Sequence, residues 1–166
     1  HGEYGWLPNL KRIEGNVYDP NAPREQLRDV GFVITLVGIL NEHRRGGFQR
    51  AHVTLIQHIV DACRATGIKR LLHMSALKAD AQNGPSQYLR TKGEGEAIAL
   101  AATDLHVTAF RPSVIFGPDD QFFNRFARPL ALSPGIFPLP CADARFAPVH
   151  ADALAEAFVP ALPPPH

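Results

Sequence analysis

A tyrosine and a lysine one helical turn apart are the residues of this chain best suited to chemistry. Tyr88 and Lys92 stand at i and i+4 in a segment rich in Ala and Glu, so a helix places the phenol and the ammonium on one face. A phenol with a pKa of about 10 exchanges protons poorly at neutral pH. A nearby cation stabilises its ionised form, and the same lysine can hydrogen-bond the hydroxyls of a nucleotide ribose. The pair indicates a proton-transfer site or a ribose-binding site, although this spacing also arises by chance.

Alternating strands and helices must position this pair. The continuous apolar run 32–37 predicts a strand buried on both faces, and Gly67 stands where a helix C-cap glycine is expected. Together the segments predict an α/β fold, Rossmann-like and doubly wound, with a mainly parallel sheet. The expected strands cover residues 10–14, 32–37, 70–75, 107–110 and 145–150, and the expected helices cover residues 48–66, 86–102, 120–132 and 152–158.

Small or polar residues stand where these strands end. In a doubly wound sheet, ligands bind beyond the carboxyl ends of the strands. We therefore expect the binding site of this chain at that edge of the sheet. The residues concerned are Asn16, Val17, Val37, Gly38, Ser75, Ala76, Pro112 and Ser113.

The composition is that of a single globular domain. The chain has 166 residues, of which 45% are hydrophobic and 20% charged, and its net charge of +1 gives no electrostatic case for nucleic acid. The apolar run 30–40 is too short to cross a membrane. Cys63 and Cys141 fit no metal or redox spacing, which favours free thiols in a reducing compartment.

Other titratable residues are better explained by structure than by chemistry. The chain has eight histidines but no His-x-x-x-His pair, and His52 and His58 lie on different faces of one helix, so no metal site is expected. His73 lies within an apolar strand and is expected to be a core histidine. Glu94 and Glu96, which continue the Tyr88 helix, are expected to face water.

Several stretches carry a resemblance to known proteins. Residues 73–77, 86–96 and 111–118 resemble the extended and atypical short-chain dehydrogenases/reductases. Residues 36–42, 117–127 and 148–152 resemble more closely the nucleotide-binding accessory subunit of respiratory complex I, NADH:ubiquinone oxidoreductase. The phenylalanine-rich stretch 117–127 discriminates best, because ordinary reductases and epimerases do not share it. The matches run from about Gly15 to Asp152.

The resemblance implies a Rossmann fold that binds a dinucleotide, NADP(H) or NAD(H). In the accessory subunit this nucleotide is regarded as structural. The resemblance places Tyr88 and Lys92 against the nicotinamide ribose, Pro112 and Ser113 near the nicotinamide, Val37 and Gly38 along the dinucleotide, and Asn16 and Val17 near the adenine.

The sequence departs from the family pattern in two ways. The N-terminal strands and the glycine-rich loop that holds the pyrophosphate are missing, so residues 1–159 are expected to form a partial NAD(P)-binding Rossmann-like domain, with 160–166 as a proline-rich end. Where members of the family have a catalytic serine or threonine, this sequence has Ala76, and Ser75 comes one residue before that position. The loss of that hydroxyl argues against efficient turnover.

The leading hypothesis is an accessory, non-catalytic subunit of complex I that binds NADP(H) structurally and supports assembly. It would be peripheral to the inner mitochondrial membrane on the matrix side, or to the cytoplasmic face in a bacterium. An alternative is a soluble reductase or epimerase of the bacterial cytoplasm, with Tyr88 as general acid/base beside Lys92 and Ser75; a nucleotide-sensing regulator is a third. The expected contact with other subunits, which could equally be core packing, is formed by Phe122, Phe123, Arg125 and Phe126.

Overall fold

A three-stranded parallel sheet is the centre of the fold. The computed structural model describes residues 11, 13–19, 21–42, 44–116 and 147–162. The strands are β1 (Phe32–Thr35), β2 (Arg70–Met74) and β3 (His106–Phe110), in the order β1-β2-β3. The predicted parallel α/β fold is therefore confirmed, and three of the expected strands are found within one or two residues of their predicted bounds.

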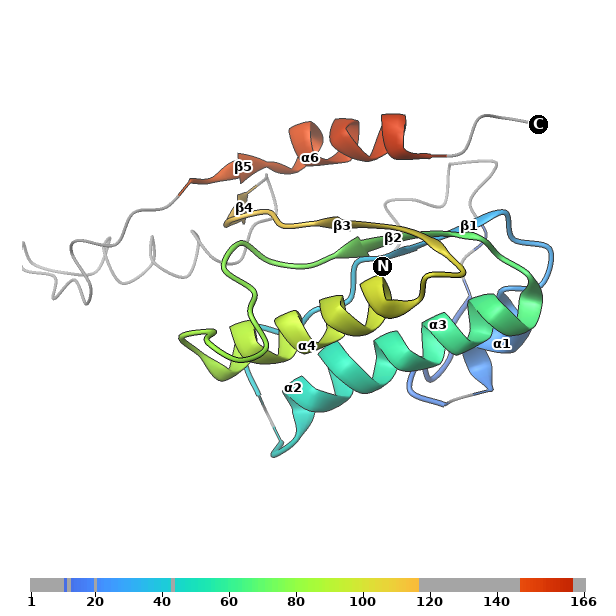
Figure 1. Ribbon diagram of the computed structural model, residues 1–166, viewed down its shortest axis with the longest axis horizontal. Coiled ribbons are helices and arrows are strands. Elements are labelled where there is room, and N and C mark those ends of the chain that lie inside the picture. Colours follow the sequence, from blue (N-terminus) through green and yellow to red (C-terminus); the bar gives the residue numbers. More distant parts are fainter. Residues whose placement is uncertain (1–10, 12, 20, 43, 117–146, 163–166) are drawn as a thin grey trace, which may run out of the picture.

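Helices cover both faces of this sheet. Figure 1 shows α3 (Leu55–Thr66) and α4 (Gln87–Ala101) side by side below the sheet, with α6 (Ala151–Phe158) above it. Phe158 of α6 stacks on Phe110 of β3, with ring centroids 4.1 Å apart. The remaining elements are α1 (Ala22–Gln26), α2 (Gly47–Gln49), the π-helix η1 (Arg50–Thr54), the 3-10 helix η2 (Val159–Ala161), and the parallel pair β4 (Ile115–Phe116) and β5 (Val149–His150).

Local sequence explains where the two long helices begin and end. The predicted helix 48–66 is formed by α2, η1 and α3 in succession, and it ends at Gly67, whose φ of 78° is the left-handed conformation that glycine adopts readily. The predicted helix 86–102 is α4, and the Ser86 side chain caps it by accepting a hydrogen bond from Leu89 N–H at 3.2 Å. These end signals fix the position of Tyr88 one residue after the start of α4.

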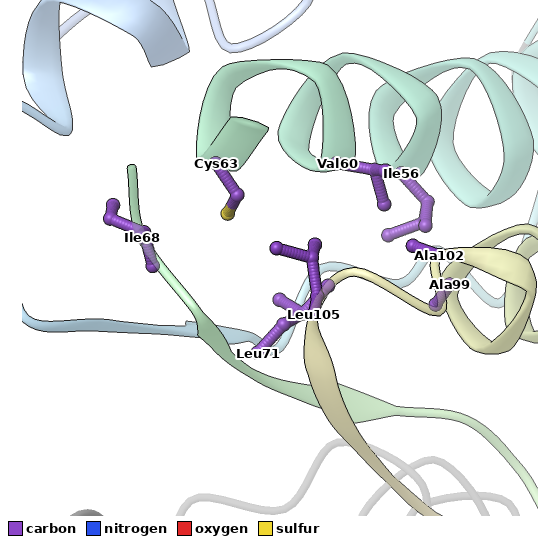
Figure 2. Close-up of a cluster of buried hydrophobic side chains, with 8 residues drawn as sticks. All are labelled: Ile56, Val60, Cys63, Ile68, Leu71, Ala99, Ala102 and Leu105. Carbon is purple, nitrogen blue, oxygen red and sulfur yellow. The ribbon is translucent and has the colours of Figure 1, made fainter. Parts of the chain in front are cut away.

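The apolar core lies between the sheet and the two long helices. Removing such side chains from water is the main favourable contribution to folding. Val33, Leu71 and Val107 are aligned across the three strands and contribute to this layer. Figure 2 shows its buried members, Ile56, Val60, Cys63, Ile68, Leu71, Ala99, Ala102 and Leu105.

Two expectations about the edge of the sheet are wrong. The described residues of 10–14 form no strand, and among the described strands none pairs with the outer edge of β1. Burial on both faces of 32–37 is also not found, because Ile34 is 38% and Leu36 63% exposed. The predicted helix 120–132 lies outside the described residues. In the described ranges, no helix is long and apolar enough to cross a membrane.

Candidate functional site

The carboxyl ends of β1, β2 and β3 lie together at one edge of the sheet. Ser75 N–H donates to Phe110 O at 2.7 Å, and Leu77 N–H donates to Pro112 O at 2.7 Å. These two bonds join the segment after β2 to the end of β3 and to the residue before Ser113. The structure therefore brings the predicted residues Ser75, Pro112 and Ser113 to neighbouring positions.

Lys92 is the charged residue at the centre of this edge. Its side chain is buried, with an exposed fraction of 3%, and Nζ donates to Met74 O at the end of β2 at 2.5 Å. A Cβ on Gly38 would lie 3.9 Å from the same Nζ, so the loop after β1 passes directly beside it. Burial lowers the pKa of Lys92 to about 8, against the opposing effect of the Glu96 carboxylate. The structure thus brings the predicted site residues Lys92 and Gly38 together.

Tyr88 is half-buried one turn before Lys92. Its ring meets the His52 ring edge-on at 5.3 Å and the Phe48 ring at 6.1 Å. Burial raises the pKa of the Tyr88 phenol, the opposite of the direction that general acid/base work at neutral pH requires. In this structure the neighbouring lysine does not offset the desolvation of the phenol.

Glu96 was expected to face water, and this expectation is wrong. Its exposed fraction is 3%, and both carboxylate oxygens accept from Arg111 Nε at 2.9 Å, with a further bond from Nη2 to Oε1. Burial alone would raise the pKa of Glu96, but the hydrogen bonds and charge of Arg111 outweigh burial, and the net shift is downward. Ser75 is itself 3% exposed, and its hydroxyl lies inside the protein with no hydrogen-bond partner among the described residues.

Two buried histidines lie next to the lysine. His73 on β2 pairs through Nδ1 with Thr35 Oγ1 at 2.8 Å and is the core histidine that the sequence predicted. His52 on η1 contacts Ile39 N–H through Nε2 at 3.2 Å and Thr91 Oγ1 through Nδ1 at 2.9 Å. Burial, reinforced by the charge of Lys92, lowers the pKa of each histidine to about 4, so both are neutral at neutral pH. From the sequence alone, His52 was considered only as a metal ligand, and that role was not favoured.

Asn16 and Val17 lie in an exposed turn before α1. Asn16 Oδ1 accepts from Tyr18 N–H at 3.1 Å, an Asx turn. The Arg50 guanidinium lies over the Tyr18 ring at 4.3 Å, which ties this turn to the beginning of η1. Val37 lies in the loop after β1 and is 36% exposed.

Other predicted features fall outside what the structure describes. Within the described ranges no group of three or more His, Cys, Asp or Glu side chains is placed to hold a metal ion. The predicted contact residues Phe122, Phe123, Arg125 and Phe126 are not among the described residues.

The lysine and its surroundings are suited to donating hydrogen bonds to hydroxyl groups. The Lys92 ammonium has three N–H bonds, of which one is directed to Met74 O. Gly38 has no side chain to block an approach to the others. A parallel sheet with a buried cation and a glycine at its carboxyl edge defines a nucleotide-binding α/β protein of the doubly wound class.

Comparison with known sequences gives the family. The family model for NAD(P)H-binding proteins matches residues 3–122, and the chain belongs to this family. A nicotinamide dinucleotide is therefore the cofactor class of the domain. The chain is 32% identical over 123 residues to NADH dehydrogenase (ubiquinone) 1 alpha subcomplex subunit 9, mitochondrial, of Mus musculus, and 25% identical over 124 residues to the protein of that name from Dictyostelium discoideum. The predicted resemblance to the complex I subunit is confirmed.

The matches cover most of this chain and a smaller part of the relatives. They include 74% of the chain but 32% of the mouse protein, so the chain spans about a third of the length of that relative. Among solved structures, MoeE5 in complex with UDP-glucuronic acid and NAD superposes with a TM-score of 0.77 at 22% identity, covering 90% of this chain and 57% of that one. Pen from Bacillus thuringiensis superposes with a TM-score of 0.79 at 12% identity, covering 96% of this chain and 51% of that one. These structures support the fold.

Proposed function

We propose that this domain belongs to an accessory, non-catalytic subunit of respiratory complex I and binds NADP(H) as a structural ligand. The observation that carries the nucleotide-binding part is the position of Lys92, buried between Met74 O and Gly38 at the carboxyl edge of the sheet. Two of its N–H bonds are left for the hydroxyls of the nicotinamide ribose. Val37, Pro112 and Ser113 line the same edge and are proposed to contact the rest of the nicotinamide half.

The groups around Tyr88 favour binding over proton transfer. A nicotinamide dinucleotide supplies hydride transfer in enzymes that also provide a proton donor or acceptor. Here burial raises the pKa of the phenol, and the only serine at the end of β2, Ser75, is turned into the interior beside Glu96. Ala76 offers no hydroxyl in its place. Tyr88 is therefore proposed as a ribose contact, together with Lys92.

The relatives supply the proposed location and partners. They are named as mitochondrial subunits of NADH dehydrogenase (ubiquinone). We place this protein on the matrix side of the inner mitochondrial membrane, or on the cytoplasmic face in a bacterium, in contact with other complex I subunits. The predicted contact surface is formed by Phe122, Phe123, Arg125 and Phe126.

The nucleotide site is tested by replacing the lysine. The full-length protein is compared with Lys92→Met and with Lys69→Met, a control at an exposed lysine, and bound NADP(H) is released by denaturing the protein at neutral pH and quantified. Because Lys92→Met loses a charge-assisted hydrogen bond, we expect its affinity for NADP(H) to be weaker by about tenfold. The affinity of Lys69→Met should not change. Equal nucleotide content in both variants contradicts the assignment of Lys92. Migration of the native protein apart from complex I contradicts the assignment to that assembly.

The alternative is a soluble NAD(P)-dependent reductase or epimerase. The observation in its favour is that Tyr88 and Lys92 share one helix face at the nucleotide edge. Steady NADPH oxidation by the full-length protein, abolished in Tyr88→Phe, would replace the accessory role with a catalytic one. Binding without turnover in both proteins supports the structural role.

A further inference from the structure

His52 joins the two parts of the chain that face the nucleotide. Its ring lies between the loop after β1, which carries Gly38 and Ile39, and the first turns of α4, which carry Tyr88 and Thr91. The ring is 2% exposed and also stacks on Phe48 at 5.5 Å. Neither the family match nor the names of the relatives assigns a role to this residue.

The hydrogen bonds around His52 determine its tautomer. Ile39 N–H is a donor, so Nε2 must accept and carries no proton. The Thr91 hydroxyl is directed to the backbone oxygens of Gln87 at 3.0 Å and Tyr88 at 3.1 Å, so its oxygen accepts from His52 Nδ1–H. The hydrogen bonds therefore all point in one direction, from Ile39 N–H in the loop after β1, through the His52 imidazole and the Thr91 hydroxyl, to the backbone of Tyr88.

The backbone around His52 is built to hold it there. His52 lies in the π-helix η1, and π-helical turns occur frequently at functional sites. A Cβ on Gly95 would lie 1.9 Å from His52 O, so α4 approaches this turn as closely as a bare backbone allows. A protonated imidazole would lose the Nε2 acceptor and would face the Lys92 ammonium and the second buried histidine, His73.

We propose that His52 is a positioning residue for the nucleotide: its neutral Nδ1–H tautomer couples the loop at Gly38 to the turn at Tyr88, and so sets the gap into which the ribose fits. This inference rests on the proposed function, because it assumes that both segments contact the dinucleotide. His52 itself touches neither the ribose nor any reacting atom. It acts through Ile39 and Thr91.

Three variants separate the two bonds that His52 makes. In His52→Gln the amide occupies the place of Nε2, which keeps the bond to Ile39 and loses the bond to Thr91. In His52→Asn the amide occupies the place of Nδ1, which keeps Thr91 and loses Ile39. Thr91→Val removes the hydroxyl with little change of shape. His106→Gln, at an exposed position on β3, is the control.

The test is NADPH affinity in the full-length protein, titrated by fluorescence well below the unfolding temperature. Each of the three variants is expected to weaken binding by about three- to tenfold, the equivalent of one hydrogen bond. Adding Thr91→Val to His52→Gln should not weaken NADPH binding further, because that variant has already lost the bond to Thr91. Adding it to His52→Asn, which keeps that bond, should weaken binding further. Nitrogen-15 NMR of the His52 ring should show the proton on Nδ1.

Each other outcome overturns the inference in a recognisable way. If the three variants bind NADPH with the affinity of the wild-type protein and differ from it only by unfolding at a lower temperature, His52 has a structural role and does not position the nucleotide. A proton on Nε2 contradicts the direction of the bonds. Absence of NADPH binding by the wild-type protein overturns the proposed function, and the role of His52 with it.

Discussion

The two halves of one interface differ in chemistry although the same elements form both. At the amino half of the strands, Val33, Leu71 and Val107 meet α3 and α4 through apolar side chains alone. Two residues further along the same strands, Thr35 and His73 are hydrogen-bonded to each other, and His73 interacts electrostatically with Lys92 and Glu96 of α4. The apolar half needs volume to be filled, whereas the polar half depends on hydrogen bonds between buried groups, of which His73 Nε2 and Ser75 Oγ have no partner among the described residues. Both halves therefore stabilise the fold, the apolar half through burial and the polar half through hydrogen bonds and the close backbone contact at Gly95.

The largest expected effect comes from the polar half, where helices meet most closely. Gly95→Ala would put Cβ 1.9 Å from a backbone oxygen, which cannot move as a side chain can. We expect a loss in the free energy of unfolding at or above the upper end of the roughly 1 to 3 kcal/mol usual for overpacking. Gly31→Ala, with no atom within 4 Å, should change the urea midpoint little. Equal urea midpoints for Gly95→Ala and Gly31→Ala would show that the contact between Gly95 and His52 O is not tight.

A cavity in the apolar half should cost somewhat less. Leu71 is fully buried, and Leu71→Ala should lower the free energy of unfolding by about 3 kcal/mol. Leu100→Ala, at a position 49% exposed on α4, is the matched control and should cost far less. If Leu71→Ala also alters the pH dependence of unfolding, the two halves are not independent.

Acid should act on the polar half alone. The pKa of His52 and of His73 is about 4 in the folded protein, below the ordinary value of 6.5. The unfolded chain therefore takes up these protons first, and stability falls as the pH drops from 6.5 towards 4, by on the order of 3 kcal/mol for each histidine. The pKa of Asp104 is lowered to about 2, so this group titrates below the window, and the pKa of Glu96 is shifted in the same direction. Urea midpoints measured between pH 6.5 and 5 that do not change would contradict this assignment, and His106→Gln should leave the slope intact.

The smallest effect is expected from a single hydroxyl. Thr35→Val keeps the shape of the side chain but leaves His73 Nδ1 without its partner, at a cost of about 1 kcal/mol. Thr103→Val, at an exposed position, should cost less. A more stable Thr35→Val protein would mean that the polar half tolerates unmatched groups.

Most of the fold followed from local signals, and part of the site did not. Gly67 and Ser86 end and begin helices by their own chemistry, and the alternation of segments gave the parallel sheet. The Tyr88 and Lys92 pair was found because its spacing is local. Glu96 was missed, although it lies four residues after Lys92 on the same face. That spacing could have indicated burial, but the partner of Glu96, Arg111, follows β3 and lies 15 residues further along the chain.

The tertiary network could not be read from the sequence. His52 occupies an ordinary place in an apolar helical pattern, and its partners Ile39 and Thr91 are 13 and 39 residues away. The π-helical turn has no sequence signal, because the approach of α4 at Gly95 depends on the packing of two helices. Such contacts follow from the assembled fold rather than from any segment alone.

The π-helical turn η1 also determines which changes of chain length the protein can accept. A π-helical turn holds one residue more than an α-helical turn, so η1 accommodates an extra residue within an otherwise α-helical segment. Deleting one residue between Arg50 and Thr54 would turn the π-helical turn into an α-helical one and leave the flanking turns in place around the helix axis. Phe48 would stay against the Tyr88 ring, but the bulge that carries His52 would be lost. A second deletion would rotate everything before it by about 100°. Homologous chains are therefore expected to differ in length across this segment by no more than that one residue.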